Sequence, residues 1–174
     1  IVDEADSVFV DEARTPLIIS AARQSVEAET FYREAVALAG QLVAGADFTL
    51  DPQRHQVSLT EPGRERLPGL AAAVTASPVW RSLLRTEEAC VLALQALHAF
   101  RRDIHYIVRD DKVMIVDEHT GRVMPDRSWE RGLQQLIEVK EGVAISPEKE
   151  TLGRISYQMF FRRYLLLSGM SGTC

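Results

Sequence analysis

The chain has 174 residues, of which 46% are hydrophobic and 26% are charged, and its formal net charge is −5. This is the balance of a soluble globular chain with room for about one to one and a half domains. The acidic charge argues against a dedicated nucleic-acid surface, which needs a clustered excess of Lys and Arg.

The first part of the chain predicts a strand, a helix and a hairpin. The β-branched, apolar run at 16–20 is typical of a strand. Ser25 is placed to cap an amphipathic helix that runs to about Ala44. Apolar segments at 48–50 and 56–59 flank a polar turn, which predicts a hairpin.

Further along, helical periodicity alternates with short apolar segments. Helices are predicted over 60–67, 77–101, 128–141 and 151–165. Strands are predicted over 105–109, 112–117, 122–124, 143–146 and 167–170. Trp80, Cys90 and His98 follow the apolar stripe of the longest helix and are expected in the core, as is Trp129.

The order of these elements predicts an α+β fold. Residues 17–20 and 143–146 are expected to pair as a two-stranded stem, so that mixed helices and hairpins form a domain inserted between them. The chain begins and ends inside strand-like segments, which indicates a piece of a longer protein. The two cysteines lie far apart, without metal-binding spacing, which fits a reducing compartment.

Apolar residues leading into Asp3 and Glu4 match the Walker B pattern of nucleotide hydrolases. Asp3 at a strand end is suited to hold Mg²⁺ through water, and Glu4 to deprotonate an attacking water. Alone the motif is also compatible with a solvated acidic turn. Asp117 and Glu118 repeat the pattern, but a turn follows them, so they are interpreted as a structural strand end. No phosphate-binding loop of the Gly-x-x-x-x-Gly-Lys-Ser/Thr type occurs in the sequence.

Several runs, in this order and spacing, resemble the SecA family of export motors. They are 2–7 (VDEADS), 11–20 (DEARTPLIIS), 115–124 (IVDEHTGRVM), 132–135 (GLQQ), 138–143 (EVKEGV) and 169–173 (GMSGT). The middle of the chain, about 21–100, is similar in pattern more than in residues. Departures at Ala21, Ala22 and Gln134 leave open whether the parent is the housekeeping motor or a divergent SecA-like protein.

The resemblance implies a division into three segments. Residues 1–16 would end a stretch of the first nucleotide-binding domain, 17–150 would form the preprotein cross-linking domain with its stem, and 151–174 would return into the nucleotide-binding domain. This core would be of the P-loop, helicase-like type and mostly absent from the chain.

It also implies cofactors and catalytic residues for the parent protein. Asp3 would be the Mg²⁺-associated acid at bound ATP and Glu4 the catalytic base. Gly169, Gly172 and Thr173 would belong to the motif that couples the nucleotide site to movement. The chain by itself is expected to hold no ATP and to be inactive as an ATPase, because the phosphate-binding loop is missing.

The partners that the resemblance implies are unfolded preproteins, the SecYEG channel and the rest of SecA, including its second nucleotide-binding domain, with no nucleic acid. The implied location is the bacterial cytoplasm, peripheral at the inner face of the plasma membrane. The domain would clamp unfolded preproteins for translocation through the channel.

Clamping must tolerate many cargo sequences, and main-chain pairing along a strand edge does so. One of two edges is expected to offer it: Leu17, Ile18, Ile19 and Ser20, or Val143, Ala144 and Ile145. The alternative is that both strands only hold the domain in place.

Two other functions stay open. The tetrapeptide from Asp3 to Asp6 also spells the DEAD box of nucleic-acid helicases, although the acidic charge and the distance of over 160 residues to Gly169 argue against them. A docking module without cargo contact is the other alternative.

Overall fold

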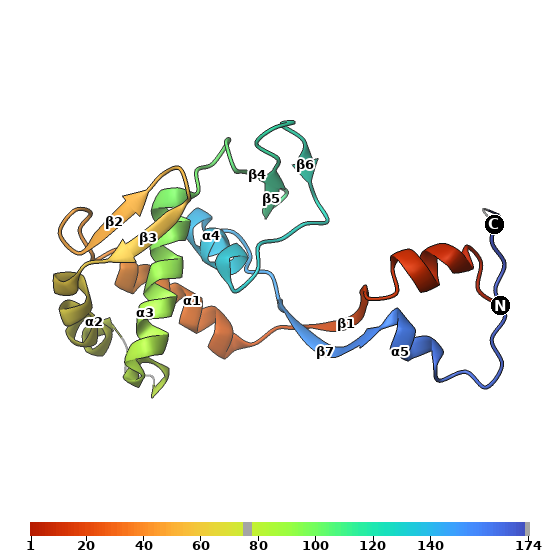
Figure 1. Cartoon of the computed structure of the whole chain (residues 1–174). Helices are drawn as coiled ribbons and strands as arrows, with labels where there is room; N and C mark the ends of the chain where they lie inside the picture. The colour runs from red at the N-terminus through yellow and green to blue at the C-terminus, as the bar shows by residue number, and fades with distance from the viewer. Residues whose placement is uncertain (75–77, 173–174) are drawn as a thin grey trace. The chain divides into compact units, whose positions relative to one another are not determined.

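The computed structural model describes residues 1–74 and 78–172, and it confirms an α+β fold of helices and small antiparallel sheets (Figure 1). The chain divides into two compact units. The terminal unit comprises Ile1–Arg23 and Pro147–Cys174, and the central unit comprises Gln24–Ser146. Within the described ranges, no helix is both long and apolar enough to cross a lipid bilayer.

The terminal unit is built on a ribbon of two antiparallel strands, β1 (Pro16–Arg23) and β7 (Glu148–Ser156). The register shifts once, between Ile19 and Ser20. The short helix α5 (Tyr157–Phe161) follows β7 directly, because the Ser156 hydroxyl accepts a hydrogen bond from the Met159 amide at 3.3 Å and caps it. A π-helical turn covers Ser7–Asp11.

The central unit contains the four longer helices and two small sheets. The helices are α1 (Val26–Ala39), α2 (Glu61–Val74), α3 (Leu83–Leu94) and α4 (Leu133–Glu141), with a 3₁₀ turn at Pro78–Arg81 and a π-helical turn at Gln95–Ala99. The sheets are the hairpin of β2 (Phe48–Asp51) and β3 (Gln56–Leu59), and the antiparallel sheet of β4 (Tyr106–Arg109), β5 (Lys112–Val116) and β6 (Val123–Met124).

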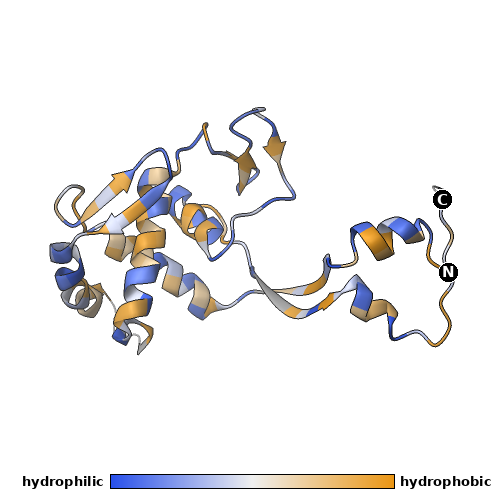
Figure 2. Cartoon of the chain, in the orientation of Figure 1, coloured by the Kyte–Doolittle hydropathy of each residue, from blue (hydrophilic) through white to orange (hydrophobic). Residues whose placement is uncertain are grey.

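One hydrophobic core serves the central unit, where α1, α3 and α4 pack against one another. These helices are amphipathic, and Figure 2 shows orange and blue residues alternating along them. The four helices and both sheets each contribute a side chain that is almost completely buried: Leu38, Phe48, Leu67, Leu94, Tyr106 and Ile137. Burial of such side chains stabilises the unit by about 1.5–3 kcal/mol each.

Both predicted hairpins are confirmed, because their turns are specified locally. Asp110 and Asp111 join β4 to β5 with φ of 51° and 58°, the left-handed conformation that two-residue hairpin turns require and that Asp tolerates. The predicted helix at 60–67 extends to Val74 and includes Pro68, because Leu67 and Ala71 continue its buried face. The helix predicted from residue 128 begins at Leu133.

Three predictions in the last third of the chain differ from the structure. Residues 143–146 form no strand, and the partner of β1 is β7 at 148–156. The first part of the predicted helix at 151–165, up to Ser156, is therefore strand, because pairing with β1 satisfies its backbone groups and Gly153 is a weak helix former, and only α5 at Tyr157–Phe161 is helical. The strand predicted over 167–170 is reduced to one bridge, between Val2 and Gly169.

Three of the four residues that were predicted in the core lie there, and the fourth does not. Trp80 is buried, stacks on Phe31 and donates a hydrogen bond from Nε1 to Glu34 at 2.7 Å. Cys90 is fully buried, and burial raises the pKa of its thiol to about 12. Trp129 packs against the core, as predicted. The prediction for His98 is wrong: it is exposed, and its tilted ring lies 5.1 Å from the centre of the Phe48 ring.

Lys140→Met is expected to lower the free energy of unfolding by about 2 kcal/mol. The Lys140 ammonium donates to the carbonyls of Ala96 (2.9 Å), inside the π-helical turn, and Phe100 (2.6 Å), which caps it, and lies 5.6 Å from the centre of the Tyr106 ring. Met keeps the aliphatic length but leaves both carbonyls without this donor. Urea unfolding measures the change; the exposed Lys112→Met should change the free energy by less than about 0.5 kcal/mol, and equal losses would contradict the role of Lys140.

Candidate functional site

The acidic motif and the C-terminal glycine run lie side by side in the terminal unit. Val2 donates to the Ser168 carbonyl at 2.8 Å and accepts from the Met170 amide at 2.9 Å. The Ala5 amide donates to the Met170 carbonyl at 2.9 Å. The structure therefore brings Asp3 and Glu4 close to the segment that contains Gly169 and Gly172, two groups more than 160 residues apart in the sequence. Thr173 lies outside the described residues.

Close packing fixes this pairing. A Cβ atom on Gly169 would lie 2.5 Å from the Cβ of Ala5, so only glycine fits without a shift. The Ser171 hydroxyl donates to Asp6 Oδ1 at 2.6 Å and ties the glycine run to the end of the acidic motif.

The Asp3 and Glu4 side chains are exposed. Asp3 Oδ1 accepts a hydrogen bond from the Glu4 amide at 2.9 Å, and Glu4 adopts a φ of 50°. The second Asp3 oxygen accepts no hydrogen bond from the described residues, so it is compatible with water-mediated Mg²⁺ binding, in which nucleotide phosphates supply most other ligands. The roles predicted for Asp3, Glu4, Gly169 and Gly172 remain predictions.

The β1–β7 ribbon offers strand edges. Its sheet has two strands among the described residues, so each strand has one edge without a strand partner. Ile18 and Ile19 are 55% and 66% exposed, which leaves the middle of β1 accessible. The ribbon thus presents both backbone groups and apolar side chains to a second polypeptide.

The register of the ribbon indicates which amide points outward. The Tyr157 amide donates to the Thr15 carbonyl at 3.3 Å. Hydrogen-bonded pairs alternate along an antiparallel ladder, so Leu17 and Ile19 are the next positions expected to bond to β7. The Ile18 amide and carbonyl are therefore expected to face the outer edge. The backbone of Pro16 faces the same way, which suits proline because it has no amide hydrogen to donate to β7.

The alternative edge at Val143, Ala144 and Ile145 does not lie in the ribbon. Ile145 is only 9% exposed and belongs to the core of the central unit. The Val143 amide donates to the Glu138 carbonyl at 3.1 Å and so continues the end of α4. Cargo contact at these three residues remains an untested prediction, and the observed strand edges belong to β1 and β7.

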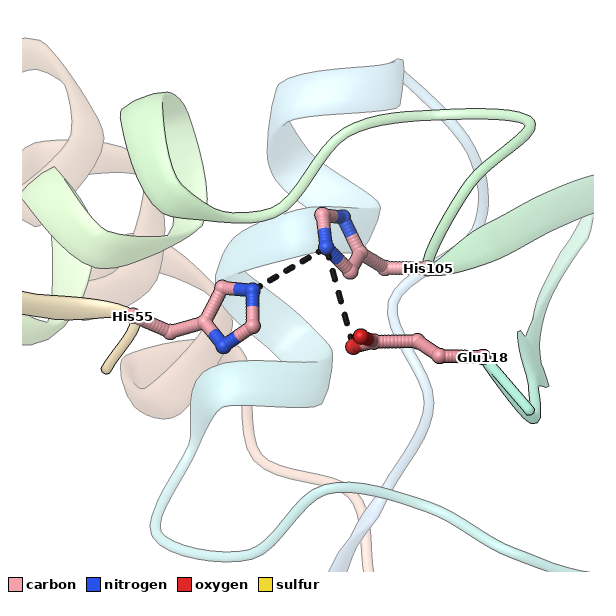
Figure 3. A group of neighbouring side chains, drawn as sticks. All are labelled: His55, His105 and Glu118. Carbon is pink, nitrogen blue, oxygen red and sulfur yellow. Dashed lines mark hydrogen bonds and ion pairs between the residues drawn. The ribbon is translucent and has the colours of Figure 1, made fainter. Parts of the chain in front are cut away.

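One polar cluster was missed by the sequence analysis. His55, His105 and Glu118 each place one potential ligand atom within 4.8 Å of the other two (Figure 3). The interpretation of Asp117 and Glu118 as a structural strand end holds for Asp117, whose Oδ1 accepts from the Thr120 amide at 2.7 Å. No spacing rule would have found the cluster, because 50 residues separate its two histidines.

Comparison with known proteins agrees with the resemblance. The family described as SecA preprotein cross-linking domain matches residues 27–138. The chain is 60% identical over its whole length to protein translocase subunit SecA 3 of Magnetococcus marinus and covers 26% of that protein. It is 53% identical over 99% of its length to SecA 2 of Bordetella avium (26% of that protein), and 46% identical over 99% to SecA of Aquifex aeolicus (17%). The chain thus spans about a quarter or less of these relatives' length, and it belongs to the SecA family.

Proposed function

We propose that this chain is the cargo-holding part of an ATP-driven protein-export motor, and that it holds unfolded preproteins by main-chain pairing along the outer edge of β1. The observation that carries the proposal is the exposed, two-stranded ribbon, whose Ile18 amide and carbonyl are expected to face outward. Family membership and the word translocase in the relatives' names support the wider role.

Strand pairing suits a motor that must move many different sequences. Backbone amides and carbonyls are the same in every polypeptide, so an edge strand binds without reading side chains. The exposed Ile18 and Ile19 add apolar contact that many cargo segments can provide. The ribbon therefore favours cargo binding over a docking module that never touches cargo.

In the parent protein we propose that Asp3 holds Mg²⁺ through water and that Glu4 accepts a proton from the water that attacks ATP. Gly169, Gly172 and Thr173 would couple this site to movement. Bound Mg²⁺ would neutralise charge on the phosphates. The proposed partners are the SecYEG channel and the second nucleotide-binding domain, at the inner face of the bacterial plasma membrane.

The test is a fluorescence-anisotropy titration of the 174-residue chain with a labelled, unfolded preprotein segment. Ile18→Pro removes the outward amide hydrogen and is expected to weaken binding about fivefold, since one hydrogen bond contributes about 1 kcal/mol and about 1.4 kcal/mol corresponds to a tenfold change. Pro is tolerated on an edge strand where the amide faces outward, so circular dichroism should show an intact fold.

Ile18→Ala is the matched control, because it removes the side chain and keeps the amide. It should weaken binding less than Ile18→Pro does. Equal weakening by both variants would assign binding to the side chain, and no saturable binding by the parent chain would favour a docking module. Tight, salt-sensitive binding of single-stranded RNA would favour a helicase fragment instead.

A further inference from the structure

The cluster of His55, His105 and Glu118 joins three separate segments of the central unit (Figure 3). His55 lies in the turn between β2 and β3, His105 precedes β4, and Glu118 follows β5. The two imidazole Nε2 atoms are 3.1 Å apart, and His105 Nε2 lies 3.7 Å from Glu118 Oε1. His105 is only 5% exposed, and the Phe100 ring stacks on His55 at 5.4 Å, so little water reaches the contact between the rings.

A backbone amide determines where the protons of this cluster lie. The Arg101 amide donates a hydrogen bond to His105 Nδ1 at 2.8 Å. Because this nitrogen accepts, a neutral His105 carries its own proton on Nε2. That proton then donates to His55 Nε2, which must accept, so the proton of a neutral His55 is on Nδ1. The result is a directed chain of hydrogen bonds from Arg101 through His105 to His55.

The direction of these hydrogen bonds argues against a metal ion bound between His55, His105 and Glu118. In a tetrahedral zinc site with Zn–N distances of about 2.0–2.1 Å, neighbouring ligand atoms lie roughly 3.3 Å apart, near the distances found here. A histidine that binds metal through Nε2 must however carry its proton on Nδ1 and donate it to an acceptor. His105 Nδ1 faces the Arg101 N–H instead, so two hydrogens would point at each other.

We propose that His55, His105 and Glu118 form a proton-operated latch that fastens the β2–β3 turn to the segment before β4. The latch is closed when both imidazoles are neutral. An added proton has two places to go: His105 Nδ1, where it meets the Arg101 amide hydrogen, or His55 Nε2, where it meets the His105 hydrogen. Either place breaks one hydrogen bond of the chain, and the Glu118 carboxylate, 3.7 Å from His105 Nε2, lies within ion-pair distance of a His105 imidazolium.

The surroundings set the direction of the pH dependence. The charged and titratable groups that face His105 are Glu118 from the loop after β5, His55 from the β2–β3 turn and Arg101. Burial lowers the pKa of His105 from 6.5, and the positive charges of His55 and Arg101 act in the same direction, whereas Glu118 opposes them. A lowered folded-state pKa means that the unfolded chain binds more protons below pH 6.5, so the latch stabilises the fold above this pH and is lost as the pH falls.

The test is urea unfolding of the 174-residue chain from about pH 7.5 to about pH 5.5 with a chelator present. All variants carry His98→Gln, because partial desolvation of the His98 ring and the nearby Lys140 charge also lower the pKa of His98. As the pH falls below 6.5, the logarithm of the unfolding constant should rise by up to about one per pH unit, for the proton that His105 binds more readily in the unfolded chain. His55→Gln should reduce the slope, because the Gln oxygen still accepts from His105 but the positive charge of His55, which lowers the pKa of His105, is gone. The exposed His119→Gln is the matched control and should leave the slope unchanged.

Nitrogen NMR of the histidine rings in the parent chain provides a second readout that needs no variant. It should show His105 with its proton on Nε2 at neutral pH. A proton on Nδ1, or equal slopes for His55→Gln and His119→Gln, would overturn the latch. Stabilisation by added Zn²⁺ that His55→Gln abolishes would overturn it in favour of a metal site.

Discussion

Glu138→Ala is expected to lower the free energy of unfolding by about 3 kcal/mol. Glu138 is 3% exposed and lies on the buried face of α4. Its two oxygens accept from different donors: the Ser146 amide at 2.7 Å and Gln134 Nε2 at 2.9 Å. Ala removes both acceptors, and each donor left without its partner in the interior costs about 1–3 kcal/mol.

The loss should be concentrated where the chain leaves the central unit. Ser146 is the last residue of that unit, and α4 holds it from two sides, since Gln135 Nε2 also donates to its carbonyl at 3.2 Å. The Ser146 amide should therefore exchange with solvent faster in Glu138→Ala, which hydrogen-exchange NMR measures beside urea unfolding.

Two matched variants separate hydrogen bonding from charge at this position. Glu138→Gln keeps one acceptor oxygen and should lose about half as much stability as Glu138→Ala. The exposed Glu130→Ala should change the free energy by less than about 0.5 kcal/mol. A loss for Glu138→Ala no larger than that for Glu130→Ala would contradict the bridging role of Glu138.

Where structure follows from neighbouring residues, the sequence was sufficient to predict it. Ser25 caps α1 as predicted, because its hydroxyl accepts from the Ala28 amide at 3.3 Å. The β4–β5 turn forms at Asp110 and Asp111, whose short polar side chains tolerate a positive φ. These features depend on contacts within a few residues, which a single sequence displays directly.

The ribbon shows what a single sequence does not display. The partner of β1 was predicted at 143–146, a short apolar run that looks like a strand. In the structure Ile145 of that run is buried in the core of the central unit, and β7 pairs with β1 over eight positions beginning at Pro16 and Ser156. Long-range pairing with β1 determined the secondary structure at 148–156, and it overrode the local helix propensity there.

The candidate sites divide in the same way. Asp3 and Gly169 were found as motifs, and the structure then brought their segments together. The latch combines His55 with His105, each of which is unremarkable in its own segment, and becomes visible only when the turn of the β2–β3 hairpin meets the segment before β4. The direction of its hydrogen bonds is set by the Arg101 amide, a backbone group whose position sequence patterns do not reveal.

Gly63→Ala is expected to lower the free energy of unfolding by about 3 kcal/mol, because a clash with rigid backbone costs about 4 kcal/mol, above the usual range for overpacking, and the helix propensity of Ala offsets about 1 kcal/mol of it. Gly63 lies in the first turn of α2, and a Cβ atom there would sit 2.0 Å from the Asp47 carbonyl oxygen. That oxygen also accepts from the Thr60 amide at 2.9 Å, while the Thr60 hydroxyl donates to the Ala46 carbonyl at 2.6 Å. The clash is with backbone, so no side-chain rotation relieves it, and the segment before β2 must move away from α2.

Gly69→Ala, in the same helix, should have the opposite sign. No atom lies within 4 Å of a Cβ built on Gly69, and the residue is exposed. Ala is favoured over Gly in a helix interior by about 1 kcal/mol, so this variant should be more stable than the parent chain. Urea unfolding of the two variants side by side cancels the helix-propensity gain that both share. The remaining difference, about 4 kcal/mol, isolates the close approach of Asp47 to α2, and two variants of equal stability would show that this approach is not required by the fold.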